Sequence, residues 1–126
     1  MLSFSMKAFI PYSISDTDAH LVYELGGLLE RQGYEVEYNW DQSNSQRVFE
    51  EVGGCQFFVG MITHPRHSKQ VQQLWQYAMA QGIPAFLLVE QNIVLPGSMS
   101  KHKQVHMFRR MMPQNPVRFI ELYFEH

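Results

Sequence analysis

Two short segments carry side chains that could bind or convert a small ligand. The first runs from residue 11 to 16 and is rich in hydroxyl groups; the second runs from residue 63 to 68 and holds two histidines and an arginine. Hydroxyl groups and cations bind phosphates, and a carboxylate can act as an acid, a base or a nucleophile. The candidate ligand-binding residues in these segments are Pro11, Tyr12, Ser13, Asp16, His64 and Ser68.

A third segment, residues 40 to 45, begins with Trp40 and continues with polar residues. The rings of Tyr12 and Trp40 could offer flat faces to a nucleobase. The histidine and arginine side chains of residues 64 to 67 could contact phosphate or substrate, with an ordinary exposed loop as the alternative. These three segments are the candidate site.

Two specific chemistries are disfavoured by what the segments lack. The hydroxyl-rich loop after residue 11 contains no glycine, so its backbone cannot wrap closely around a phosphate, and flavin binding is not expected. A phosphoacceptor receiver domain needs acids at its strand ends. The expected strands here end in Tyr12 and Thr63 instead.

Few acids are placed to do catalysis. Asp16 and Asp41 lie in expected loops, where capping or solvation explains them well. Glu90 ends an apolar run and is the outside candidate for a catalytic acid, because the carboxyl end of a buried strand is a common catalytic address. His102 and His106 stand four residues apart but lack a third ligand, so we predict no metal site.

Composition excludes several classes of protein. The chain of 126 residues has a net charge of −2, which gives no general footprint for nucleic-acid binding. The basic residues between positions 101 and 110 are interpreted as a solvated helix face. The single cysteine, Cys55, lies in an apolar run and excludes a disulfide framework within the chain.

The same evidence bears on location. No apolar stretch approaches the roughly 20 residues needed to span a bilayer, and residues 1 to 10 do not resemble a signal peptide. We therefore expect a soluble, cytoplasmic protein without a membrane or nucleic-acid partner. We treat residues 1–126 as one domain, with residues 1–5 as a possible disordered extension.

Strand-like and helix-like patterns alternate along the chain. Residues 34 to 40 alternate between apolar and polar, as in a half-exposed strand, whereas residues 55 to 63 are almost continuously apolar, as in a strand buried on both faces. The expected strands are 6–12, 34–40, 55–63, 85–89 and 117–124; the expected helices begin at Ser15, near Val48, at Ser68 and at Lys101.

This order predicts a three-layer α/β/α domain with a flavodoxin-like, doubly wound parallel sheet. Right-handed crossovers leave few topologies, and the strand order 2-1-3-4-5 places the half-exposed strand at an edge. Ligands bind such sheets outside the carboxyl ends of the strands, near the point where the strand order reverses. The three candidate segments should meet there.

Three stretches resemble bacterial Toll/interleukin-1 receptor (TIR) domains. Residues 8 to 13 (AFIPYS) with Asp16 resemble the family's strand opening, and residues 82 to 86 (GIPAF) resemble its entry to the fourth strand. Residues 59 to 63, followed by residues 68 to 78, resemble the segment in which a serine opens the third helix. The resemblance covers about residues 6 to 90.

The resemblance implies chemistry that one position contradicts. Many TIR domains cleave NAD or cyclise its ADP-ribose part, with a glutamate four residues before an alanine of the third helix. That position is Leu74 here, and the family's tryptophan falls on Gln70. Nucleoside deoxyribosyltransferase-like proteins carry an acid in the same slot. A leucine cannot stabilise or attack the cationic sugar through which glycosyl cleavage passes.

Three hypotheses remain open. The first is a TIR-like signalling or defence module that binds a nucleotide of the NAD or ADP-ribose type, or a protein partner such as a second TIR-like domain, without ordinary NADase activity. The second is an NAD glycohydrolase, cyclase or deoxyribosyltransferase-like enzyme with a displaced acid. The third is a plain interaction module. No cofactor is required by any of them, and NAD would be a ligand or a substrate. Leu74 is kept among the candidate ligand-binding residues because of its position.

Overall fold

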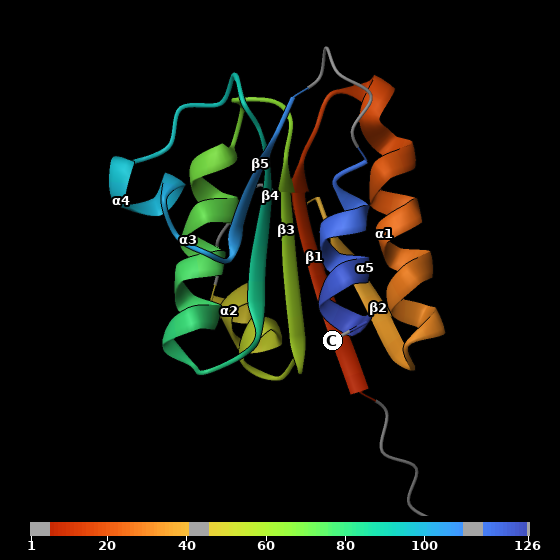
Figure 1. Cartoon of the computed structure of the whole chain (residues 1–126). Helices are drawn as coiled ribbons and strands as arrows, with labels where there is room; N and C mark the ends of the chain where they lie inside the picture. The colour runs from red at the N-terminus through yellow and green to blue at the C-terminus, as the bar shows by residue number, and fades with distance from the viewer. Residues whose placement is uncertain (1–5, 41–45, 110–114, 126) are drawn as a thin grey trace, which may run out of the picture.

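The computed structural model describes residues 6–40, 46–109 and 115–125. Within these residues, five strands and five α-helices follow one another, with a short 3₁₀ turn before the first helix (Figure 1). The strands are β1 (Met6–Ser13), β2 (Tyr34–Asn39), β3 (Phe57–Ile62), β4 (Ala85–Glu90) and β5 (Val105–Phe108). The helices are α1 (Ala19–Arg31), α2 (Gln46–Gly53), α3 (Ser68–Ala80), α4 (Gly97–Ser100) and α5 (Val117–Glu125), and the 3₁₀ turn is η1 (Asp16–Asp18).

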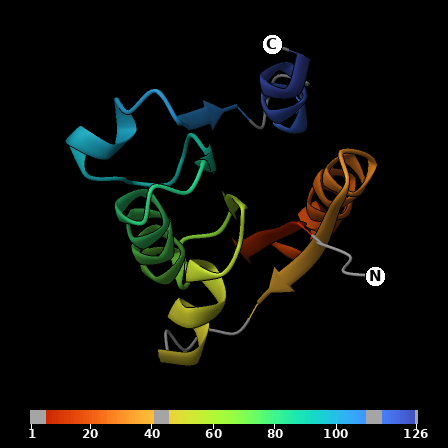
Figure 2. The ribbon, with the colours of Figure 1, turned by 90° about the horizontal axis from the view of Figure 1, so that it is seen from below.

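The five strands form one parallel sheet in the order β2-β1-β3-β4-β5. Strand β1 lies between β2 and β3, so the chain leaves it toward one edge of the sheet and later returns on its other side. Helices α1 and α5 cover one face of the sheet, and α2, α3 and α4 cover the other (Figures 1 and 2). The predicted three-layer, doubly wound fold and its strand order are confirmed.

The alternation of side chains along each strand divides the core into two apolar layers. Phe9, Phe58 and Leu87 belong to the layer beneath α2 and α3. Ile10 and Phe57 belong to the layer beneath α1 and α5. Strands β3 and β4 are buried along their whole length, which is what their continuous apolar sequences predicted.

The two edges of the sheet differ. Strand β2 pairs only with β1 in the described sheet, and its Glu35 and Glu37 are exposed, as the alternating sequence predicted. Strand β5, at the other edge, has only four residues. Gly33 and Gly82 have positive φ angles of 95° and 75° just after α1 and α3, so both act as the expected helix stops.

Two expectations for the end of the chain are wrong. Residues 101 to 108 do not form a helix: they form a turn and the strand β5, which supplies the fifth strand of the sheet. The segment 117 to 124, expected to be that strand, is the helix α5. Its buried residues Val117 and Ile120 lie three apart, so they fall on one helix face against α1 and the sheet. No described helix is long and apolar enough to cross a membrane.

Candidate functional site

A cleft of about 780 Å³ opens at the carboxyl ends of β1, β2 and β3. It lies where the strand order reverses, the place at which open α/β sheets bind ligands. The volume is within the range of ordinary small-molecule sites. The lining residues are Tyr12, Ser13, Ile14, Ser15, Asp16, Ala19, Trp40, His64, Arg66 and His67. All three predicted segments therefore contribute to one cleft.

Aromatic rings form one part of the lining. Tyr12 is the second-last residue of β1, and Trp40 directly follows β2, whose Asn39 pairs with Pro11. Continuing that register by one residue places Tyr12 beside Trp40 on the same face of the sheet. The Trp40 side chain is 68% exposed, so its ring is accessible to a ligand. Burial raises the pKa of Tyr12, which keeps its hydroxyl a neutral hydrogen-bond donor.

Cationic and imidazole side chains form another part. His64, Arg66 and His67 come from the loop between β3 and α3, and the Arg66 side chain is exposed. The His64 ring is held by its own loop, because the backbone N–H of Arg66 donates to His64 Nδ1 at 3.0 Å. His67 adopts the left-handed conformation (φ 64°), a strained conformation for a residue with a side chain. It turns the chain sharply into α3.

The loop after β3 is joined to the end of β1 by backbone hydrogen bonds. The N–H groups of Thr63 and His64 both donate to the Ser13 carbonyl oxygen, at 2.8 and 3.2 Å. The sheet ladder is thereby extended past the last paired residues, Ser13 and Ile62. The two loops that carry the lining residues consequently share one anchor.

The third part of the lining comes from the start of α1. Asp16 opens the turn η1 and is exposed, and Ala19 begins α1. Ser15 Oγ donates to the Asp18 carboxylate at 2.6 Å. The expected helix start at Ser15 is thus a short 3₁₀ turn, and α1 itself begins at Ala19. Asp16 is the only acid among the described lining residues.

Three of the predicted ligand-binding residues do not line the cleft. Pro11 is buried within β1, and Ser68 is buried at the start of α3, where its Oγ accepts a hydrogen bond of 3.5 Å from Gln72. Leu74 is 2% exposed and belongs to the apolar layer between α3 and the sheet. Trp75 packs in the same layer, and its Nε1 donates to the Ala85 carbonyl oxygen at 3.1 Å.

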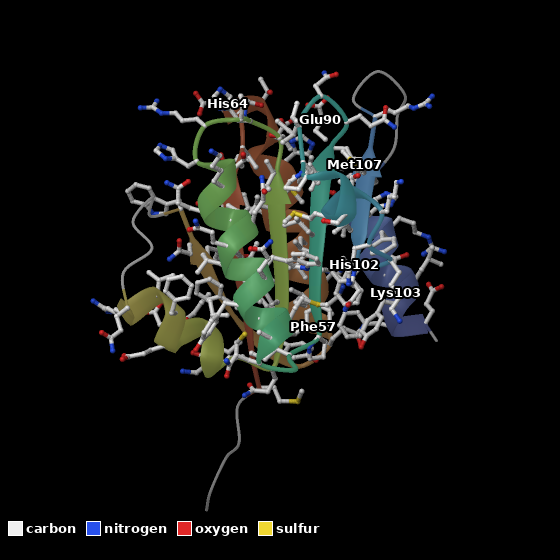
Figure 3. All side chains as sticks on the ribbon, turned by 90° about the vertical axis from the view of Figure 1, so that its left-hand side faces the viewer. Phe57, His64, Glu90, His102, Lys103 and Met107 are labelled. Carbon is white, nitrogen blue, oxygen red and sulfur yellow. The ribbon has the colours of Figure 1, made fainter. Side chains whose placement is uncertain are left out.

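Glu90 lies at the expected end of the sheet but apart from the cleft lining. It closes β4, is 4% exposed, and points to the α1 and α5 face, because Phe86 and Leu88 share that face by alternation. Figure 3 shows His64 and Glu90 at the same end of the sheet and Phe57 at the opposite end. Glu90, the less favoured candidate for a catalytic acid, is thus a buried residue two strands away from β1.

Some lining residues were not singled out from the sequence. Ile14 and Ser15 fall within a predicted segment, but Ala19 does not. Its position three residues after Asp16 was a usable signal, since residues three apart on a helical turn share a face. A small side chain there leaves room at the start of α1. Residues 41 to 45 of the third predicted segment lie outside the described residues.

The other constellations do not form sites. His102 lies in the turn before β5 and meets Trp75 edge-on, and His106 lies in β5 with its ring stacked on Phe119 at 4.7 Å. Their spacing of four residues would put them on one face of a helix, but this segment is a turn and a strand. Within residues 6–40, 46–109 and 115–125, no group of three or more histidine, cysteine, aspartate or glutamate side chains is arranged to hold a metal ion.

The fold and the cleft define a flavodoxin-like α/β domain with a pocket at its topological switch point. No protein-family model matches the chain, and no curated protein matches it. Among solved structures, the CMP N-glycosidase of Clostridium botulinum matches with a TM-score of 0.62 and 19% identity, covering 91% of this chain and 99% of that one.

Two further structures have similar folds. A response regulator receiver protein of Sinorhizobium medicae has a TM-score of 0.57 at 10% identity and covers 98% of this chain and 95% of its own. A de novo designed protein with a Rossmann 2x3 fold has a TM-score of 0.56 at 13% identity, covering 95% of this chain and 90% of its own. At these identities the three structures establish the fold alone.

Proposed function

We propose that this chain is a nucleotide-binding module that takes its ligand in the cleft between residues 11–16, Trp40 and residues 64–67. The observation that carries the proposal is the composition of the cleft. An accessible indole and a phenol lie at one part of its lining, and an arginine with two imidazoles lies at another. A base can stack on the rings while phosphate oxygens pair with Arg66.

The remaining lining suits a sugar. The hydroxyl group of Ser15 and the carboxylate of Asp16 lie on the loop from β1 to α1. An acid on such a loop can accept hydrogen bonds from ribose hydroxyls. Together with the resemblance to TIR domains, this composition supports a ligand of the NAD or ADP-ribose type and a role in signalling or defence.

We further propose that ligand binding here proceeds without ordinary NAD cleavage. The position that corresponds to the TIR glutamate holds Leu74, whose side chain is buried in the core and does not line the cleft. Moving an acid into this position would bury it rather than present it to a ligand. The first hypothesis from the sequence is therefore the one that we retain.

Binding can be tested with the two tryptophans as reporters. Trp40 is exposed in the cleft and Trp75 is buried in the core, so stacking of a base should quench the Trp40 fluorescence. Titration of pure protein with NAD, ADP-ribose and nucleoside monophosphates should give saturable quenching and a higher melting temperature. No saturable signal with any of these ligands refutes the proposal.

Matched variants locate the site. Trp40→Ala, followed by the ligand-induced rise in melting temperature, should weaken binding about 5- to 150-fold, since a stacked base contributes about 1–3 kcal/mol. Tyr23→Ala removes an equally exposed ring (68% for each) that does not line the cleft, and should leave binding unchanged. Arg66→Ala and the nearby exposed cation Lys69→Ala form a second pair, in which only Arg66→Ala should weaken phosphate-bearing ligands. Equal losses within either pair contradict this location of the site.

A second function is favoured by one observation. Asp16 is an exposed carboxylate in the cleft lining, and a glycosidase with a displaced acid needs a carboxylate at its site. Incubation with NAD and with CMP, followed by assay for released base, tests it. Turnover that is abolished by Asp16→Asn supports the enzyme, and absence of release from both substrates excludes it for them.

A further inference from the structure

Ser13 is the residue at which the two loops of the cleft are fastened together. Its side chain is 6% exposed although it lies beside the open cleft. Its Oγ donates to the carbonyl oxygen of Arg66, and the carbonyl oxygen of His64 lies 3.2 Å from the same oxygen. One buried hydroxyl therefore contacts the backbone on both sides of Pro65.

The backbone of the same residue contacts the other end of this loop. The Ser13 carbonyl oxygen accepts from the N–H groups of Thr63 and His64, as described above. A reciprocal contact runs in the opposite direction, because the N–H of Ser15 donates to Thr63 Oγ1 at 3.1 Å. Thr63 is itself buried. The β1 and β3 loops thus hold each other through both backbone and side-chain groups.

These contacts determine the backbone position from which the Arg66 side chain extends into the cleft. The loop from residue 64 to 67 turns sharply, with His67 in the left-handed conformation. The hydrogen bond from Ser13 fixes the peptide group between Arg66 and His67, and hence the Cα positions from which both side chains start. Without it the Arg66 carbonyl oxygen would lose its protein donor and the loop could adopt other conformations.

The aromatic part of the lining does not depend on this hydroxyl. Tyr12 belongs to β1, and Trp40 follows β2, which pairs with the other side of β1. Loss of the Ser13 hydroxyl should therefore affect the phosphate-binding part of the cleft and leave the base-stacking part in place.

We propose that Ser13 is a positioning residue that makes the cleft selective for phosphorylated ligands, by holding the backbone of residues 64 to 67 so that Arg66 faces the bound phosphate. This inference rests on the proposed nucleotide-binding function. The inference adds that selectivity for a nucleotide over its nucleoside depends on Ser13, which contacts the loop of residues 64 to 67 and not the phosphate of the ligand.

The experiment compares AMP with adenosine, each titrated against the wild type and Ser13→Ala by Trp40 fluorescence. We expect Ser13→Ala to weaken AMP binding about tenfold, equivalent to about 1.4 kcal/mol, and to change adenosine binding less than twofold. Ser100→Ala is the matched control, because the Ser100 hydroxyl also donates to a backbone carbonyl (Gly97, 3.0 Å) but belongs to α4. It should change neither affinity.

A double-mutant cycle separates positioning from a general loss of structure. If Ser13 acts through Arg66, then Ser13→Ala should have little further effect on AMP binding in an Arg66→Ala background. Full additivity of the two substitutions overturns the proposal, as does an equal loss of AMP and adenosine binding in Ser13→Ala. Should Ser13→Ala fail to fold, Ser13→Cys replaces it, since a thiol fills a similar space but is only a weak donor.

The outcomes distinguish this inference from the function on which it rests. If the wild type binds neither AMP nor adenosine nor the dinucleotides, the proposed function fails and the inference with it. If the wild type prefers AMP to adenosine and Ser13→Ala retains the same preference, nucleotide binding stands and only the role of Ser13 is refuted.

Discussion

Substitution of Leu74 by glutamate is the sharpest test of how the helix α3 relates to the cleft. The substitution restores the residue type that TIR-like chemistry uses at this position. In this structure the Leu74 side chain is 2% exposed, among the apolar residues between α3 and strands β1, β3 and β4. We therefore expect Leu74→Glu to damage the core and to create no active site.

The size of the effect follows from two contributions. Removing a buried leucine side chain costs about 2–5 kcal/mol. Placing an ionised carboxylate in the apolar layer adds several kcal/mol more. Since a domain of this size is stable by about 5–15 kcal/mol, Leu74→Glu should lose at least about 5 kcal/mol and approach the limit of folding at pH 7.

Urea denaturation followed by circular dichroism measures this loss. Leu74→Met, which nearly conserves the volume, should cost less than about 1.5 kcal/mol and serves as the control. Leu74→Gln separates the charge from the shape. Because burial favours the neutral acid, the deficit of Leu74→Glu should shrink as the pH falls from 7 toward 4.5, whereas that of Leu74→Gln should not.

The reasoning would be refuted by a stable variant. If the free energy of unfolding of Leu74→Glu is within about 1 kcal/mol of the wild-type value, the side chain has access to solvent or to the cleft. Release of nicotinamide from NAD by such a variant would show that the position faces a bound substrate. Either result would favour the hypothesis that this chain is an enzyme acting on NAD.

Three further predictions concern stability. Burial raises the pKa of Cys55 from 9.0 to about 11, so the unfolded chain loses this proton at a lower pH than the folded one, and the free energy of unfolding falls by about 2 kcal/mol as the pH rises from 9 to 11. Urea unfolding at pH 8 and 10.5 should show a smaller fall in this free energy for Cys55→Ala than for the wild type. Burial lowers the pKa of His106, so the stability gained from its neutral ring is present above pH 6.5 and is lost on acidification. His106→Gln should therefore lose less unfolding free energy than the wild type between pH 7 and 5, and an equal loss in both proteins contradicts this. In Gly60→Ala the added Cβ would lie 2.8 Å from Leu87 and from Val71, so the melting curve should show a loss of about 1–3 kcal/mol, and no loss would mean that the central sheet yields there.

The first two thirds of the fold could be predicted because each local pattern favours one kind of element. The continuous apolar run before Thr63 is typical of a buried strand, and the alternation of residues 34 to 39 is typical of a half-exposed strand at or near an edge. The order of these elements then fixed the topology, and the topology placed Tyr12, Trp40 and His64 at one cleft.

The end of the chain could not be predicted because its patterns are ambiguous. Residues 117 to 125 contain apolar or aromatic residues at both helical and strand spacing, and only contact with α1 and the sheet selects the helix. Strand β5 has four residues with no alternation in burial, so pairing with β4, and not its own sequence, makes it a strand.

The exposed glutamates of β2 have a consequence for the behaviour of the protein at high concentration. An open strand edge is a template onto which another chain can add a strand, and such pairing leads to aggregation. Glu35 and Glu37 place two negative charges along this edge, so two β2 strands brought together would repel each other at neutral pH. Substitution of both glutamates by threonine should therefore promote edge-to-edge association of the folded protein.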